Sequence, residues 1–294
     1  MLWAVFTLIA AAAQTARNAM QRELTATLGT VGATHVRFLF GFPFALIFLP
    51  AVMIAAGYGL PSPPLVFWPW VIVGALTQIA ATATMLSVMG ERSFVVAYAY
   101  IKTEPVQVAL FGLIFLGDKI TPLTGAAIFI ATAGVILISL KAGAGQVTTT
   151  RSTVIGLMSG ALFALSAISY RGAILSLDLP HFVMAATFTL AVGLVIQAAL
   201  LSAYLALRDP AVLTAIAKAW RPSLFAGFMG AFASEFWFLG FAIASAANVR
   251  TLALVEVLFA QGVTHFVFKQ PTTPRERLGI VLVVAGVALL VWAY

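Results

Sequence analysis

Long apolar runs separated by short polar connections dominate the pattern of this chain. Most of the runs are close to the length of about 20 residues that crosses a bilayer as a helix. We therefore predict ten transmembrane helices, at residues 2–21, 31–57, 66–89, 93–116, 121–140, 153–172, 180–206, 222–244, 247–268 and 274–293.

The connections between these runs are short and carry helix breakers and charges, as in GYGLPSPP at 57–64 and RDP at 208–210. Composition agrees with the pattern, because 62% of the residues are hydrophobic and 9% are charged, whereas soluble domains carry about 25% charged residues. The sequence therefore predicts an all-α integral membrane protein without an extramembrane catalytic domain.

The net charge of +7 comes from basic residues that are scattered singly between the apolar runs. Such residues set topology and contact anionic lipid head groups, so we expect membrane lipids as partners and no nucleic acid. The chain has no cysteine, which excludes disulfides and thiol chemistry.

The two halves of the chain are related by an ungapped offset of 152 residues. This offset superposes Trp68 on Trp220, Glu104 on Glu256, and Thr121-Pro122 on Thr273-Pro274. We predict a first five-helix repeat at 1–140, a linker at 141–152 and a second repeat at 153–294. An odd number of spans in each half gives the halves opposite orientations, an inverted repeat that places a substrate site near the midplane, around a central cavity.

Basic residues are unevenly distributed between the two sides. Connections after odd-numbered spans hold eleven, with Arg17 counted among them, and connections after even-numbered spans hold three, with Arg250 counted among them. Because Lys and Arg accumulate on the cytoplasmic side, this distribution places both termini outside the cytoplasm.

The fourth predicted span contains Tyr98, Tyr100, Lys102, Glu104 and Pro105 near its middle. Each charge costs at least about 2.5 kcal/mol there on insertion scales, and the proline frees a carbonyl. We therefore expect a polar, broken helix. On a continuous helix Lys102 and Glu104 project about 200° apart and cannot face one cavity. The two charges either form a structural ion pair, with snorkelling of the lysine as a variant, or contact a charged substrate.

The ninth predicted span carries Glu256, Gln261 and His265. Three polar groups on one membrane helix indicate a lined pathway, or else hydrogen bonds that join helices. In the eighth span, Glu235 and Trp237 lie in an aromatic stretch that suits a pocket for a cation or a ring, or that faces lipid. Apolar surroundings favour a protonated carboxyl group, so Glu235 or Glu256 could couple transport to protons.

Other polar residues complete the predicted substrate site. They are Gln14 and Arg17 at the end of the first span and Gln78 in the third. Arg37 in the second span is predicted near an interface, where it either snorkels or binds a substrate carboxylate.

The end of each half resembles a known family. The stretch EPVQVALFGLIFLGDKITPLTGAAIFIATAGVILI, with its Glu-Pro entry, Gly-acid turn and Thr-Pro start, resembles the EamA-type family of the drug/metabolite transporter superfamily. The second half departs from the pattern, with Val257 in place of the proline and Lys269-Gln270 at the Gly-acid pair. The resemblance implies an exporter or exchanger of small metabolites, with amino acids as the best-known cargo, in the inner (plasma) membrane.

Several function classes lack their signatures in this sequence. No glycine precedes a lysine, so there is no phosphate-binding loop, and the three histidines lie far apart without a metal motif. We expect a small-molecule substrate, no cofactor, no bound metal and a functional monomer. The alternatives are a membrane channel or facilitator and, less favoured, an intramembrane enzyme.

Overall fold

The computed structural model describes residues 1–88, 94–139, 150–259, 261 and 273–294, and these residues form helices and connections without any strand. The helices are α1 (Leu2–Leu39), α2 (Phe42–Ala56), α3 (Phe67–Val88), α4 (Phe94–Ile101), α5 (Glu104–Phe111), η1 (Gly112–Leu116), α6 (Pro122–Ser139), α7 (Thr150–Ser176), α8 (Phe182–Arg208), α9 (Pro210–Lys218), α10 (Trp220–Ile243), α11 (Ala246–Leu252), η2 (Ala253–Val255) and α13 (Pro274–Ala293). Most of the predicted linker 141–152 lies outside the described residues; α7 already begins at Thr150.

Eight helical segments of the described chain are long and apolar enough to cross a membrane, against the ten that were predicted. The all-helical membrane class is thereby confirmed. The predicted span 2–21 forms the first part of α1 and is not one of the eight, and the predicted span 247–268 ends among residues outside the described part.

Helix α1 is two helices joined at Gly29. Its 38 residues would extend about 57 Å if straight, which is far more than a bilayer core of about 30 Å. Gly29 has φ 68° and ψ 176°, a conformation open mainly to glycine, and the chain reverses there. The side chain of Gln21 then donates a hydrogen bond of 3.1 Å to the Ala33 carbonyl across the turn.

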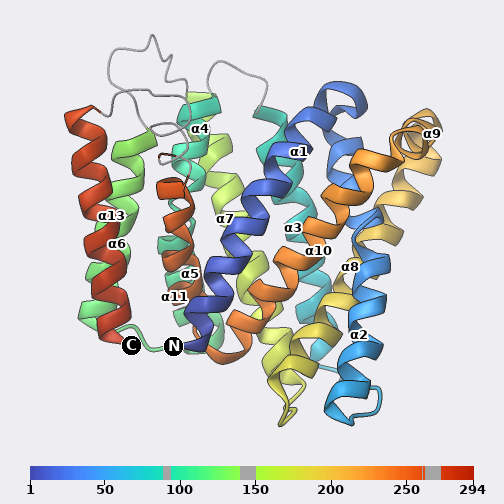
Figure 1. The fold of residues 1–294 in the computed structure, drawn as a ribbon, viewed down its shortest axis with the longest axis horizontal. Helices are drawn as coiled ribbons and strands as arrows, with labels where there is room; N and C mark the ends of the chain where they lie inside the picture. Colours follow the sequence, from blue (N-terminus) through green and yellow to red (C-terminus); the bar gives the residue numbers. More distant parts are fainter. Residues whose placement is uncertain (89–93, 140–149, 260, 262–272) are drawn as a thin grey trace.

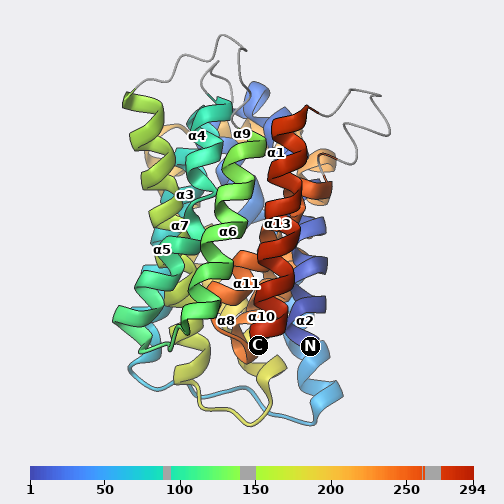
Figure 2. The same cartoon turned by 90° about the vertical axis from the view of Figure 1, so that its left-hand side faces the viewer.

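The long helices pair across the two halves of the sequence. Helix α1 packs on α10 and α3 packs on α7, while α6 lies beside α13 and α2 beside α8 (Figures 1 and 2). If each helix is replaced by its counterpart in the other half, the α1–α10 pair becomes the α7–α3 pair. The α6–α13 and α2–α8 pairs are each converted into themselves. Both chain termini lie at the same end of the bundle (Figure 1).

Glycines allow a close contact between α6 and α13. A Cβ atom on Gly134 would lie 2.7 Å from the Gly279 carbonyl oxygen, and one on Gly286 would lie 2.5 Å from the Ala131 nitrogen. Gly134, Gly279 and Gly286 thus let α6 and α13 approach closely, in agreement with small-residue packing in membranes.

The predicted fourth span is divided into three pieces. Lys102 and Thr103 form a turn between α4 and α5, and the π-helix η1 follows. Pro105 lacks the N–H that would bond to the Ile101 carbonyl in a continuous helix. That carbonyl oxygen instead faces Gly160 of α7, where an added Cβ would come within 3.2 Å.

Helix α9 lies where the sequence predicts a connection between two spans. It begins with Pro210 at its first turn, where proline is tolerated, and lies at the end of the bundle opposite to the termini (Figure 1). Its only buried residue is Ile216.

Candidate substrate cavity

A polar cavity of about 30 Å³ lies inside the bundle. Its walls come from α1, α3, α4, α5, α7, α10 and α11. The lining residues are Gln14, Arg17, Asn18, Arg37, Gln78, Met85, Tyr98, Ile101, Lys102, Glu104, Phe163, Trp237 and Arg250. A smaller cavity shares Gln14, Lys102, Glu104 and Arg250 with it and adds Glu256. Both repeats therefore contribute to one polar interior.

The break after α4 brings Lys102 and Glu104 to the same cavity. They would face opposite ways on a continuous helix, and the break between α4 and α5 removes this restriction. The turn at Lys102–Thr103 changes the direction of the chain exactly between the two side chains.

Two ion pairs cross between the halves of the molecule. Lys102 of the first half pairs with Glu256 of the second, and Arg250 of the second half lies with its Nε 3.0 Å from Glu104 Oε1 of the first. All four side chains are largely buried, with exposed fractions between 5% and 12%. The two glutamates that the repeat superposes are therefore each neutralised by a cation of the opposite half.

Further polar contacts fix Glu256 in place. The Gln14 amide donates to Glu256 Oε2 at 3.4 Å, and the Tyr98 hydroxyl donates to Oε1 at 3.4 Å. Gln14 in turn accepts a hydrogen bond of 3.2 Å from the Trp237 indole. These contacts connect α1, α4 and α10 around one carboxylate.

Aromatic rings cover the cations of the ion pairs. The Arg250 guanidinium lies 4.6 Å from the centroid of the Trp237 ring, and Lys102 Nζ lies 5.0 Å from the centroid of the Tyr98 ring. Such cation–π contacts contribute about 0.5–2 kcal/mol each, more when desolvated. They hold both cations in position where water is scarce.

Arg17 and Arg37 are the most deeply buried cations of the cavity. They are 2% and 3% exposed, and both lie in α1, on either side of the reversal at Gly29. The prediction that Arg17 belongs to a connection was wrong: the helix continues past it and turns it inward. Arg37, predicted near an interface, lies in the interior.

Comparison with known proteins agrees with this architecture. The model of the EamA-like transporter family matches the chain twice, over residues 1–140 and 149–292. The chain belongs to the EamA-like transporter family. The resemblance seen in the sequence is thereby confirmed, and the chain is a multi-pass membrane transporter built of two repeats.

A solved structure supports the fold of this EamA-like transporter. It is described as the crystal structure of a protein, has 18% identity and a TM-score of 0.66, and the match covers 99% of each chain. At this identity it shows the shared fold alone. A search of the curated proteins gave no match.

Three predicted site residues lie away from the cavity lining. Glu235 of α10 faces α8 and accepts a hydrogen bond of 2.6 Å from the Thr187 hydroxyl. Tyr100 and Gln261 are half-buried and line neither cavity. His265 lies outside the described residues.

Gln78 lines the cavity and is held there by a hydrogen bond. The Gln197 amide of α8 donates to Gln78 Oε1 at 2.8 Å and to the Ala75 carbonyl at 3.3 Å. Gln197 therefore joins α8 to α3.

Arg250 is the main residue that the site prediction missed, together with Asn18. It had been counted as a connection residue because it lies near the start of the ninth span. A lone arginine six residues before Glu256 in an apolar stretch is nevertheless the signal that marks functional charges in membranes.

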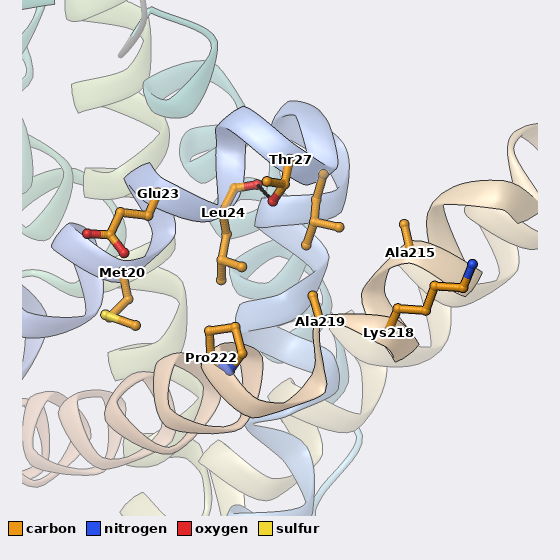
Figure 3. Close-up of a pocket in the computed structure, with 9 residues that line it drawn as sticks. Met20, Glu23, Leu24, Thr27, Ala215, Lys218, Ala219 and Pro222 are labelled. Carbon is orange, nitrogen blue, oxygen red and sulfur yellow. Dashed lines mark hydrogen bonds between the residues drawn. The ribbon is translucent and has the colours of Figure 1, made fainter.

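A second hollow of the transporter is apolar and lies at the end of the bundle where α9 is found. Met20 and Leu24 of α1, Ala219 and Pro222 line it (Figure 3). Its two charged side chains, Glu23 and Lys218, lie at opposite ends and point away from each other (Figure 3). It lacks the converging polar groups of the central cavity.

Proposed function

We propose that this EamA-like transporter is a secondary carrier that exports or exchanges small polar metabolites, foremost amino acids, by alternating access. The observation that carries the proposal is the crossed pair of ion bridges, Lys102–Glu256 and Arg250–Glu104, inside the cavity. Each bridge joins one repeat to the other.

A substrate with both charges can replace these contacts. An ammonium group competes with Lys102 or Arg250 for a glutamate, and a carboxylate competes with a glutamate for the cation. Exchange of one ion pair for another keeps buried charges compensated, which avoids the cost of several kcal/mol for an unpaired buried charge. Zwitterionic amino acids offer both groups within a few ångströms.

Alternating access requires the two repeats to move relative to each other about this site. The pairing of α1 with α10 and of α3 with α7 supports an inverted arrangement of the repeats. A third ion pair, Asp118 Oδ1 to Arg171 Nη2 at 3.3 Å, also joins the halves. It lies where the connection from η1 to α6 meets α7, toward the end that holds the termini (Figures 1 and 2). In the proposed cycle this pair opens and closes that end.

The test is counterflow in proteoliposomes with the purified full chain, using a panel of amino acids. A carrier shows saturable uptake that is accelerated by unlabelled substrate inside. Unsaturable flux without such acceleration would indicate a channel or facilitator and would overturn the alternating-access proposal. Repeating the assay with the pH gradient collapsed tests proton coupling, for which Glu235 is the favoured carrier because the nearest described partner is the neutral Thr187 hydroxyl.

A further inference from the structure

Among the residues that the structure describes, the ion pairs of the cavity leave two arginines without a carboxylate partner. The cavities are lined by four cations, Arg17, Arg37, Lys102 and Arg250, and by two anions. Both anions, the glutamates, are paired with Lys102 and Arg250. The described lining of the two cavities therefore holds an excess of two positive charges, at Arg17 and Arg37.

The two arginines lie side by side over one glycine of α10. A Cβ atom on Gly230 would lie 3.3 Å from Arg37 Cγ and 3.4 Å from Arg17 Cδ. The glycine thus makes room for both aliphatic stems, and two like charges, which repel each other, line one cavity.

Both guanidinium groups have donors without an acceptor among the described residues. Arg17 donates from Nη2 to Asn18 Oδ1 at 2.7 Å, but its Nε and Nη1 have no partner. Arg37 donates from Nη1 to the Thr82 hydroxyl at 3.1 Å, and its Nε has no partner. Buried donors are normally satisfied, so these atoms mark a place for an acceptor that a ligand supplies.

We propose that Arg17 and Arg37 form an oxyanion subsite that selects substrates with a net negative charge. The inference rests on the proposed carrier function and names its substrate class. A carboxylate or phosphate group accepts several hydrogen bonds from arginine in a fixed planar geometry. It would satisfy the free donors, while a second charged group of the substrate would replace one partner in the Lys102–Glu256 or the Arg250–Glu104 pair.

The experiment measures counterflow and ligand-induced thermal stabilisation of the full chain. The probes are L-aspartate, succinate, glycerol 3-phosphate, L-alanine and L-lysine. We expect the first three, which are net negative, to exchange and to stabilise the protein more than the neutral and cationic amino acids do. Comparison of succinate with glycerol 3-phosphate distinguishes a carboxylate from a phosphate ligand.

The variants Arg17→Gln and Arg37→Gln should raise the KM for the best anionic probe by about tenfold to a hundredfold, the effect of one lost charged hydrogen bond. Exposed Arg208 of α8 provides the matched control, and Arg208→Gln should leave the KM unchanged. Removal of an uncompensated buried cation should also raise the melting temperature of the ligand-free protein. Removal of an arginine with a structural role only would lower it.

The two levels of the proposal fail in different ways. If L-alanine or L-lysine exchanges as well as the anions, in wild type and in both arginine variants alike, the oxyanion subsite is overturned and the carrier remains. If no probe exchanges, the amino-acid carrier itself is overturned. If the Arg17→Gln variant melts at a lower temperature than the wild type, the Arg37→Lys variant provides the deciding test. Lysine keeps the charge but lacks the planar pair of donors, so an unchanged KM for the best anionic probe would contradict the subsite.

Discussion

Single charges inside a membrane domain persist where other charges compensate them. Glu256 is 5% exposed and is bound by Lys102, with Gln14 and Tyr98 as further donors. A buried carboxylate with these partners remains charged at moderate cost, but the same carboxylate without the lysine does not. The ion pair therefore links the two halves, and each of its two buried charges is compensated by the other.

Removal of one partner of this pair should destabilise the protein more than removal of both. Lys102→Met leaves Glu256 unpaired, and we expect a loss of about 3–5 kcal/mol in the free energy of unfolding. The double variant Lys102→Met/Glu256→Gln should recover most of that loss. Denaturation in detergent, arranged as a double-mutant cycle, measures the coupling; strictly additive effects would contradict the pairing.

At the scale of the element, close helix contacts depend on single glycines. Gly134 of α6 faces the backbone of α13, where an added Cβ would lie 2.7 Å from both Gly279 O and Val283 N. Gly125 of the same helix has only an Ile120 methyl group nearby, at 3.9 Å. One helix thus offers a crowded glycine and an open one.

Alanine at these two positions should have opposite effects. Gly134→Ala should separate α6 from α13 and cost about 1–3 kcal/mol, as overpacking does. Gly125→Ala should stabilise the protein by up to about 1 kcal/mol, since alanine is the better helix former. Melting temperatures of both variants check this prediction, and a loss of stability at both positions would refute the specific contact.

The sequence predicts those helices well whose bounds follow from the length of an apolar run. It predicts the exact place of a local interruption in a helix poorly. The apolar runs predict α3 and α8 directly, and Pro105 predicts a broken helix. The reversal falls in the connection between the predicted spans 2–21 and 31–57, but its position at Gly29 has no signal of its own, because glycine is common in membrane helices and only tertiary packing selects its positive φ. Amphipathic α9 was missed because its nine residues are too few for a span.

At the scale of the whole molecule, the two ends of the bundle have different connections. The connection after α2 lies at the end that holds both termini, and α9 lies at the opposite end (Figure 1). The excess of basic residues in connections after odd-numbered spans predicts that the α9 end faces the cytoplasm. The excess remains when Arg17 and Arg250, which line the cavity, are left out of the count.

Because the chain has no cysteine, single cysteines report this orientation without background. Gly59 and Thr214 are both exposed and lie in the α2–α3 connection and in α9, respectively. A membrane-impermeant maleimide added to intact cells should label Gly59→Cys and should label Thr214→Cys only after permeabilisation. The reverse pattern would show that the termini are cytoplasmic.

The candidate site could be predicted in part from the same sequence. The offset of 152 residues singles out Glu104 and Glu256, and the intramembrane charges mark Lys102. Their partners could not be predicted, because the pairs join residues of different halves and depend on how α5 meets α11. Lys102 has no counterpart at that offset, yet Arg250, at another position of the second repeat, has the corresponding role.

In the proposed transport cycle, Glu104 and Glu256 each release the cation of the opposite half and bind a charged group of the substrate instead. Counterflow in proteoliposomes with Glu104→Gln and Glu256→Gln, compared with the exposed-residue control Glu23→Gln, tests it most directly. We expect both cavity variants to lose about tenfold to a hundredfold in transport efficiency, the effect of one charged hydrogen bond, while the control keeps its rate. Wild-type rates in both cavity variants would contradict the account.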